Sequence, residues 1–233
     1  MVNSAAVAVP VAVVGGLFLA WHGLTWWEVD KKCEKPKYEL IRSIKCGSRH
    51  WYGAAKIVEV RKYAPYIVAS FTADAESNMR ESLGKGFMSV AGYIFGKNQS
   101  KASDASTKVA MTSPVVSEKV AMTSPVVSTS SGEAFEVSFI MPSEYTMDTL
   151  PTPTNPRVQL REVPSRRLAA LRWRGPSVKE DVMMAYAAEL RAALEREGLK
   201  IKAKEDAPIL FQYHPPFAPP WMRINEVLFE VSE

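Results

Sequence analysis

The chain has 233 residues, 47% of them hydrophobic, which is enough to bury one sizeable core or two small ones. The formal net charge of +4 is modest and the basic side chains are scattered, so we expect no nucleic-acid partner. The two cysteines, Cys33 and Cys46, permit one bridge or two free thiols but exclude a disulfide framework. No Cys/His spacing typical of a zinc site is present.

The N-terminal segment has the composition of a membrane span. No charged side chain occurs from Met1 to Trp27, and residues 5–27 are mostly apolar, which exceeds the about 20 residues that cross a bilayer. A basic leader and a small-residue cleavage pattern are missing, so we predict a retained anchor over residues 1–27. Basic residues follow this segment and none precedes it, which predicts a single-pass protein whose C-terminal domain faces the cytosol. A plastid envelope and an endomembrane both remain open.

A charged connector and the first half of a folded domain follow the span. Residues 28–55 show no regular pattern, and we place the domain at residues 56–233. An amphipathic helix is predicted within residues 77–95, although glycines weaken it by about 1 kcal/mol each relative to alanine. These glycines are Gly84, Gly86 and Gly92. Strands are predicted at 57–63, 66–72 and 134–141.

An identical decapeptide occurs twice in this half, at residues 108–117 and 119–128, with Glu118 between the copies. Each copy reads as a short extended segment that ends at a turn, because Val and Thr favour strands and Ser-Pro disfavours helix. The copies are either two strands of a hairpin or one strand and a lengthened loop.

The second half repeats the order of the first. A proline-rich connector covers residues 142–156, and a helix follows from Ser177, which forms a capping box with Glu180, to about Gly198. Strands are predicted at 158–163, 168–173, 209–213 and 224–231. Each half is therefore strand, strand, helix, strand, strand. Two such βαββ-type units bury their open faces by packing together, which predicts an α+β fold with two outer helices.

Several motifs occur in order along the domain. They are Val60-Arg61-Lys62-Tyr63-Ala64-Pro65, Gly86-Phe87 with Tyr93-Ile94, the Met-Thr-Ser-Pro-Val units, Phe139-Ile140-Met141-Pro142-Ser143, and Tyr213-His214-Pro215-Pro216 followed by Arg223-Ile224-Asn225-Glu226-Val227. By these motifs the sequence resembles the SOUL family of haem-binding proteins over residues 56–231. Plant-like members are similar in carrying the Met-Thr-Ser-Pro unit twice. The resemblance implies a distorted β-barrel, built from a duplicated unit and flanked by two helices.

The resemblance also implies reversible, non-covalent binding of haem or a related tetrapyrrole in a shallow apolar groove, for buffering or delivery. It places the ligand against the first helix and the C-terminal loop. The apolar candidates are Leu83, Phe87, Val90, Ala91, Ile94, Phe217 and Trp221. Lys85 and Arg223 are the candidate partners of the propionates. Plain core is the alternative explanation for the helix stripe, because every amphipathic helix has one.

Iron ligation is where the chain departs from part of the family. Some members carry a histidine at the position of Lys62, so that ligand is missing here. His214 is the histidine nearest to the predicted groove and the candidate iron ligand, with a surface loop position as the alternative. Met88, Met111 and Met122 offer thioethers, although methionine mostly fills gaps in cores.

Catalytic signatures are missing from the sequence. It has no P-loop, GxGxxG, HExxH or GxSxG run, so we predict a monomeric binding domain without catalytic residues rather than an enzyme. Two alternatives remain. One is a binding module for another amphipathic small molecule, since paired βαββ units also resemble bacterial effector-binding domains. The other is a membrane-tethered interaction protein that binds no haem.

Overall fold

The structure is a computed structural model, and it describes ten stretches of the chain. They are residues 33–46, 56–73, 79–101, 105–120, 134–175, 179–202, 207–214, 218–219, 221 and 223–232, the first of which begins at Cys33. The predicted membrane anchor and Phe217 lie outside these residues. Within the described stretches, no helix is both long enough and apolar enough to cross a membrane.

Two helices and a large antiparallel sheet make up the described part, as expected for an α+β fold. The helices are α2 (Met79–Ile94) and α3 (Glu180–Arg196). The strands are β1 (Tyr38–Cys46), β2 (Lys56–Tyr63), β3 (Tyr66–Ala73), β4 (Asn98–Gln99), β5 (Val115–Val120), β6 (Ala134–Ile140), β7 (Thr152–Pro153), β8 (Val158–Val163), β9 (Arg166–Arg174), β10 (Ile209–Gln212) and β11 (Ile224–Glu230). Apart from β1, β5 and the two-residue strands β4 and β7, these strands confirm the predicted ones to within two residues.

Nine strands form one sheet in the order β1-β2-β9-β11-β10-β5-β6-β3-β8, and β4 pairs with β7. The first unit contributes β2, β3, β5 and β6, and the second contributes β8, β9, β10 and β11. Starting at β2, the first strand of the first unit, the next strands are β9, β11 and β10, which are the second, fourth and third strands of the second unit. Starting at β8, the first strand of the second unit, the next strands are β3, β6 and β5, which are the second, fourth and third strands of the first unit. Thus β2 pairs with β9, and β8 pairs with β3. The sheet has the internal two-fold order expected of a duplicated unit.

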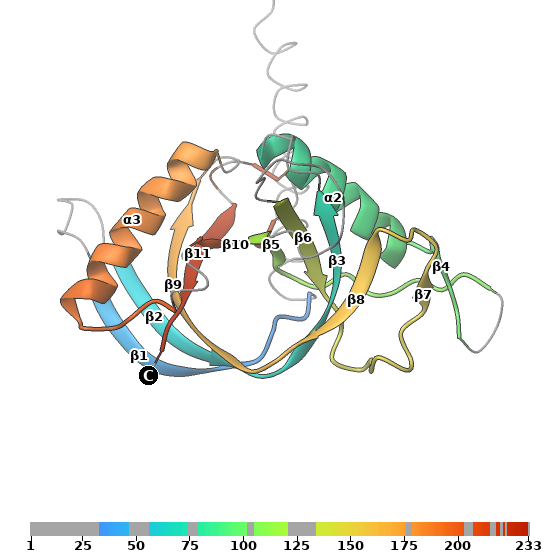
Figure 1. The fold of residues 1–233 in the computed structure, drawn as a ribbon, viewed down its shortest axis with the longest axis horizontal. Helices are drawn as coiled ribbons and strands as arrows, with labels where there is room; N and C mark the ends of the chain where they lie inside the picture. The colour runs from blue at the N-terminus through green and yellow to red at the C-terminus, as the bar shows by residue number, and fades with distance from the viewer. Residues whose placement is uncertain are drawn as a thin grey trace, which may run out of the picture.

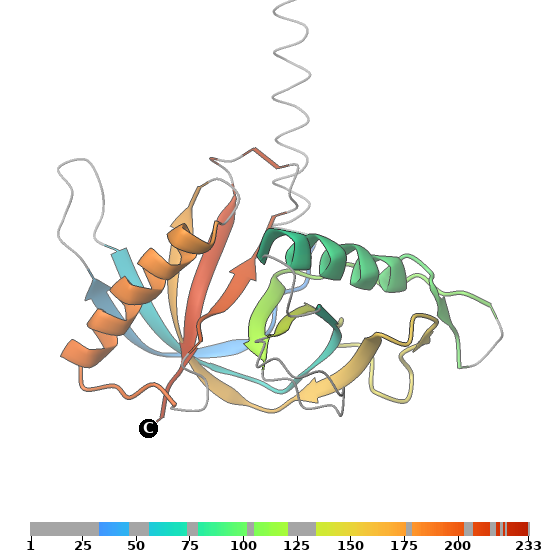
Figure 2. The ribbon, with the colours of Figure 1, turned by 45° about the horizontal axis from the view of Figure 1, so that its top comes forward.

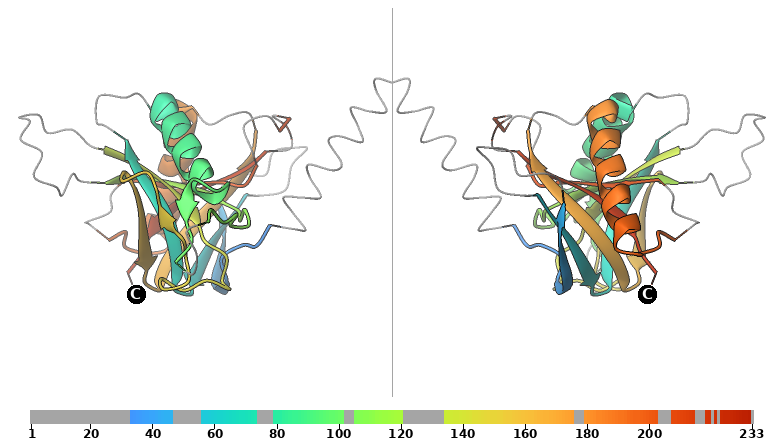
Figure 3. Two further views of the ribbon diagram at one scale, coloured as in Figure 1. Left: turned by 90° about the vertical axis from the view of Figure 1, so that its right-hand side faces the viewer. Right: turned by 90° about the vertical axis from the view of Figure 1, so that its left-hand side faces the viewer.

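The sheet is strongly curved, and each helix covers one half of it (Figure 1 and Figure 2). Helix α3 packs on β1, β9 and β11, whereas α2 packs on β3, β6 and β8. The two end views show both helices along the sheet (Figure 3). The sheet order ends at β1 and β8, which do not pair with each other in the described part of the chain. The structure therefore shows a curved open sheet, where the family resemblance implied a distorted barrel.

Strand β1 corrects the prediction of an irregular connector. Residues 38–46 pair with β2 in antiparallel register, from Tyr38 opposite Tyr63 to Cys46 opposite Lys56. Only Ile44 and Cys46 are buried along β1. The strand therefore lacks the alternation of apolar and polar residues that marks a half-buried strand. The folded part begins before Lys56.

The decapeptide repeat contributes one strand to the described part of the chain. Strand β5 combines the end of the first copy with the start of the second, and it pairs with β6 and β10. The first copy is fixed by hydrogen bonds: the Thr112 hydroxyl donates to the Ile140 carbonyl, and the Ser113 amide donates to the Glu34 carbonyl (3.0 Å). The rest of the second copy, residues 121–128, lies outside the described stretches. Within those stretches the two copies do not form a hairpin.

The ends of α3 confirm one predicted signal and correct another. Gly198 follows the helix with a left-handed φ of 68°, and its amide donates to the Glu195 carbonyl, as expected of a glycine stop. The helix begins at Glu180, and its N-cap residue is Lys179, which makes no side-chain cap hydrogen bond. The helix thus begins later than the capping box predicts, and Ser177 itself lies outside the described residues.

Candidate functional site

The apolar stripe of α2 is mostly core. Val90, Ala91 and Ile94 are buried and pack with side chains of the sheet. Phe87 is half-buried, and its ring lies 5.4 Å from that of Phe139. Leu83 is half-buried and packs against the core cluster that contains the buried side chains of α3. Three of the five α2 residues predicted for the groove therefore hold the helix on the sheet and present almost no surface to a ligand.

The opposite face of α2 is open and partly apolar. Met88 is 69% exposed and Phe95 is 62% exposed. A Cβ built on Gly84 would meet nothing within 4 Å, so the helix backbone is bare at this position. Lys85 is exposed and forms an ion pair with Glu81 (Nζ to Oε1, 2.7 Å). This outer surface, defined by Gly84, Lys85 and Met88, was not the face that the sequence pattern singled out.

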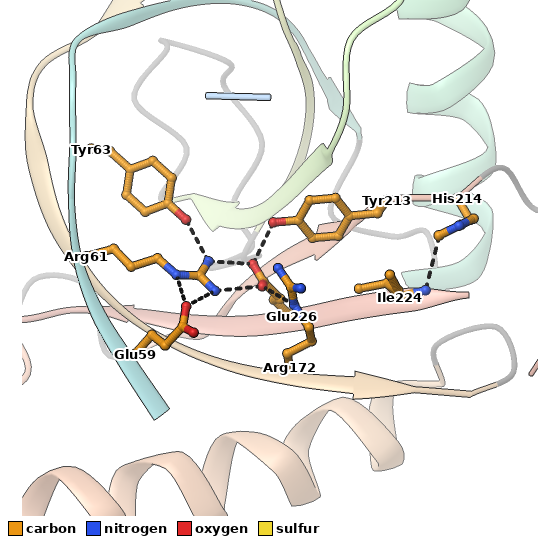
Figure 4. Close-up of polar contacts among 8 residues, drawn as sticks. All are labelled: Glu59, Arg61, Tyr63, Arg172, Tyr213, His214, Ile224 and Glu226. Atoms are coloured by element: carbon orange, nitrogen blue, oxygen red, sulfur yellow. Dashed lines mark hydrogen bonds and ion pairs between the residues drawn. The ribbon is translucent and has the colours of Figure 1, made fainter. Parts of the chain in front are cut away.

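The C-terminal loop presents one large aromatic ring. Trp221 is 64% exposed. Arg223 is half-buried, and its Nε donates to the Ala218 carbonyl (2.7 Å), so this predicted propionate partner also holds the loop. His214 is half-buried, and its Nδ1 accepts the Ile224 amide (3.2 Å, Figure 4). An iron bond from His214 would have to use Nε2, which is buried, so the imidazole would have to turn to reach a bound ligand. Within the described stretches no group of His, Cys, Asp and Glu side chains is arranged to hold a metal ion.

A buried ion pair is hydrogen-bonded to Tyr213, the residue that precedes His214. Arg61 of β2 and Glu226 of β11 are 2% and 0% exposed, and two parallel N–H···O contacts of 2.9 Å join them. The Tyr213 hydroxyl donates to the Glu226 carboxylate (2.6 Å), and Arg61 donates to the Tyr63 hydroxyl (3.0 Å). Figure 4 shows Arg61, Arg172 and Tyr213 converging on the Glu226 carboxylate, whereas Tyr63 and Glu59 contact Arg61.

Electrostatics keep this cluster charged. Burial works to raise the pKa of Glu226, but the hydrogen bonds and charges of Arg61, together with Arg172, outweigh burial and hold that pKa below its ordinary value. Burial raises the pKa of Tyr213, and the neighbouring Glu226 carboxylate raises it further, so the tyrosine stays a neutral donor. The cluster therefore fixes the end of β10, and with it the start of the loop that carries His214.

Arg61 and Glu226 occur in two of the family motifs, but nothing in these motifs predicts that they meet. The signal was available in β2, because Glu59, Arg61 and Tyr63 share one face of the strand while Val58 and Val60 share the other. Because Arg61 lies on this polar face and is buried, its charge needs a buried acidic partner. The sequence alone does not identify which of its acidic residues that partner is.

A second pair occupies the equivalent place in the other half. Arg161 of β8 contacts Glu136 of β6 across β3, as Arg61 of β2 contacts Glu226 of β11 across β9. Each pair joins the first strand of one unit to the fourth strand of the other. The pairs differ in burial, since the Arg161 side chain is 41% exposed. The two units therefore share the position of a charged contact as well as the order of their strands.

The lowered pKa of Glu226 predicts a pH dependence of stability. Because the folded pKa lies below the unfolded one, the stabilisation is complete above the ordinary carboxyl pKa and is lost as the pH falls through the lowered value. We expect the difference in unfolding free energy between the parent and Glu226→Gln to shrink on acidification from about pH 7 to about pH 2. Urea unfolding along this series measures it. A difference that stays constant with pH would contradict the assignment.

A pocket of about 510 Å³ opens where the turns between β2 and β3 and between β8 and β9 meet the N-terminal segment. Residues from three of the quoted motifs line it: Ala64 and Pro65, Thr112, and the segment from Ile140 to Ser143. None of the lining residues belongs to α2 or to the C-terminal loop. No sequence signal pointed to this pocket, because its residues come from distant parts of the chain.

Comparison with solved structures shows similarity in fold alone. The chain is 13% identical to a hydrolase from Listeria innocua, with 88% of this chain and 98% of that chain covered and a TM-score of 0.47. It is 13% identical to an uncharacterized conserved protein from Listeria innocua, with the same coverage and a TM-score of 0.49. It is 9% identical to a putative bacterial transcription regulation protein from Staphylococcus aureus MU50, with 76% and 98% covered and a TM-score of 0.39. These similarities carry no functional argument.

Sequence comparison is more specific. None of the curated proteins matches the chain. The family model described as "SOUL heme-binding protein" matches residues 33–230. The match runs from just before β1 to the end of β11, and so it covers both units and all five motifs that carry the resemblance. The chain therefore belongs to the SOUL family of haem-binding proteins.

Proposed function

We propose that this protein binds haem or a related tetrapyrrole non-covalently on the outer surface of α2. The observation that carries the proposal is the bare helix backbone at Gly84 beside the exposed Met88. Glycine inside a helix costs about 1 kcal/mol relative to alanine. Packing accounts for Gly86, whose added Cβ would come within 2.5 Å of Val137, but it does not account for Gly84, whose added Cβ would meet nothing. A bare backbone lets a flat ligand approach closely.

The residues around Gly84 fit a planar amphipathic ligand. Met88 supplies an accessible, polarizable side chain, and Lys85 supplies a cation for a propionate. From the C-terminal loop, Trp221 supplies an exposed ring, and His214 is the proposed iron ligand through Nε2. The buried residues Val90, Ala91 and Ile94 support the helix from beneath. When bound, the tetrapyrrole itself supplies any redox and spectral properties of the complex.

Because the family is named for haem binding, we propose that the protein is a carrier without a catalytic site. Phe217 and Arg223 belong to the proposed site through their place in the loop. The apolar segment over residues 5–27 supports a membrane anchor with the domain on the cytosolic side. In this proposal, the protein buffers or delivers its ligand at that membrane surface.

A haem titration of the full-length protein in lipid nanodiscs tests the site, with empty nanodiscs subtracted. We expect saturable one-to-one binding that Met88→Asp weakens about tenfold or more, because burial of a methionine side chain is worth about 1.5–3 kcal/mol. Met184→Asp on α3 is the matched control, since Met184 is 48% exposed on the outside of the equivalent helix. Haem absorbance and tryptophan quenching report both variants.

Two further variants sharpen this experiment. Gly84→Gln should weaken haem binding without loss of stability, because it adds bulk at a position with open space and favours helix. His214→Ala should shift the Soret band if the imidazole is bound to iron. Equal haem binding by Met88→Asp, Met184→Asp and the parent would show that the outer surface of α2 is not the site.

A further inference from the structure

We infer that the pocket at the β2–β3 and β8–β9 turns is a second binding site, for a compact monocarboxylic acid with an aromatic or branched apolar body. Its volume of about 510 Å³ lies within the range of pockets that hold small organic ligands. It shares no lining residue with α2 or the C-terminal loop, so this site stands independently of the tetrapyrrole surface.

The walls are apolar and stiff. The lining includes Pro36, Pro65, Pro142, Pro164, Tyr66 and Tyr145. Proline rings have a fixed φ and tyrosine rings lose little side-chain freedom, so a ligand that packs on them orders few groups. Ile67, Ile140 and Met141 complete the apolar lining. Such walls suit a flat or branched hydrocarbon body better than a polar one.

Hydrogen bonds between the lining segments hold the pocket open in advance of a ligand. The Ala64 amide donates to the Lys37 carbonyl (3.0 Å), which ties the N-terminal segment to the β2–β3 turn. The Ser143 amide donates to the Glu34 carboxylate (3.1 Å), which ties the same segment to the end of β6. A preformed pocket lowers the entropic cost of binding.

Charge selects the acid. Two lysines, Lys35 and Lys37, lie on the N-terminal wall, whereas the Glu34 carboxylate already accepts a backbone amide. Glu162 of β8 is the second acid of the lining, so the lining carries two positive and two negative side chains and the selection of an acid depends on Lys37. Among the described residues the Lys37 ammonium has no side-chain partner. A carboxylate at Lys37 would form a charge-assisted contact beside an apolar wall.

Three ring-matched probes test this inference by calorimetry on the full-length protein in lipid nanodiscs: 2-naphthoate, 2-naphthamide and 2-naphthylmethylamine. We expect 2-naphthoate to bind about tenfold more tightly than the uncharged amide, which is the usual gain from a hydrogen bond to a charged group. We expect the amine, which is protonated at neutral pH, to bind least tightly. Lys37→Met removes the charge and keeps most of the side-chain length, so it should abolish the preference for the acid.

Matched variants locate the site. Lys62→Met changes an exposed lysine that does not line the pocket, and it should leave the preference intact. Ala64→Leu adds bulk to the lining and should weaken all three probes. Met88→Asp should leave 2-naphthoate binding unchanged, and haem should not displace it. The inference is wrong if the amide binds as tightly as the acid, if Lys37→Met keeps the preference, or if haem displaces the acid. The comparison of acid with amide and the effect of Lys37→Met do not depend on haem binding to α2.

Discussion

We expect Glu226→Gln to lower the free energy of unfolding by about 3 kcal/mol. The substitution leaves the guanidinium of Arg61 buried without its main counter-charge, and breaking a buried pair in this way costs about 3–5 kcal/mol. The lower end applies because Glu59, which is one-third exposed, still pairs with Arg61 (2.7 Å). Urea unfolding at neutral pH, followed by tryptophan fluorescence, measures the loss.

The other half of the molecule supplies the control. Glu136→Gln removes the equivalent carboxylate, but its partner Arg161 reaches water, so we expect a loss of about 1 kcal/mol or less. Replacing both Arg61 and Glu226 by leucine should cost less than Glu226→Gln alone, because no charge is then left buried. Equal losses for Glu226→Gln and Glu136→Gln would mean that burial does not set the strength of these contacts.

Two glycines in one helix should respond to alanine in opposite directions. Gly86→Ala should lower the free energy of unfolding by about 2 kcal/mol, because the added Cβ would lie 2.5 Å from Val137, which is buried in β6. Gly84→Ala should raise it by about 0.5–1 kcal/mol, because its Cβ meets nothing and alanine favours helix. Thermal and urea unfolding of the two variants measure both effects.

A compensating substitution separates packing from helix propensity. Val137→Ala removes Cγ2, one of the two Val137 atoms that lie 2.5 Å from a Cβ at position 86, and keeps the other, Cβ, so it relieves part of the clash. The double variant Gly86→Ala with Val137→Ala should therefore be more stable than the sum of the two single effects predicts. Strict additivity, or a stabilising Gly86→Ala, would contradict the close approach of α2 to β6.

Local patterns predicted the elements whose side chains alternate or repeat on one face. Strand β8 occupies the predicted residues, Val158–Val163, and α2 and α3 lie within their predicted ranges. Strand β1 was missed because neighbouring strands and α3 bury only two of its side chains, which leaves no alternation to detect. Its place in the sheet depends on its pairing with β2, which its own composition does not encode.

The candidate site was less accessible to sequence reasoning. The α2 stripe was recognisable as apolar, but periodicity does not say whether such a stripe meets a ligand or a sheet. Most of it meets the sheet. The outer surface at Gly84 and Met88 has no periodic signature, and neither does the pocket at the turns, whose walls come together only through long-range pairing. Arg61 and Glu226 likewise meet across 165 positions of the chain.

The exchange of first strands between the two units makes each unit an incomplete sheet. Strand β3 pairs with β6 of its own unit on one side, but its other neighbour, β8, belongs to the second unit. Strand β9 likewise pairs with β11 of its own unit and with β2 of the first unit. A chain cut between the units, within residues 142–156, would yield two halves that must reassociate before β3 pairs with β8 and β9 pairs with β2. The single polypeptide is in this sense a domain-swapped dimer with a covalent link between its protomers, so its two halves are expected to unfold together as one cooperative body.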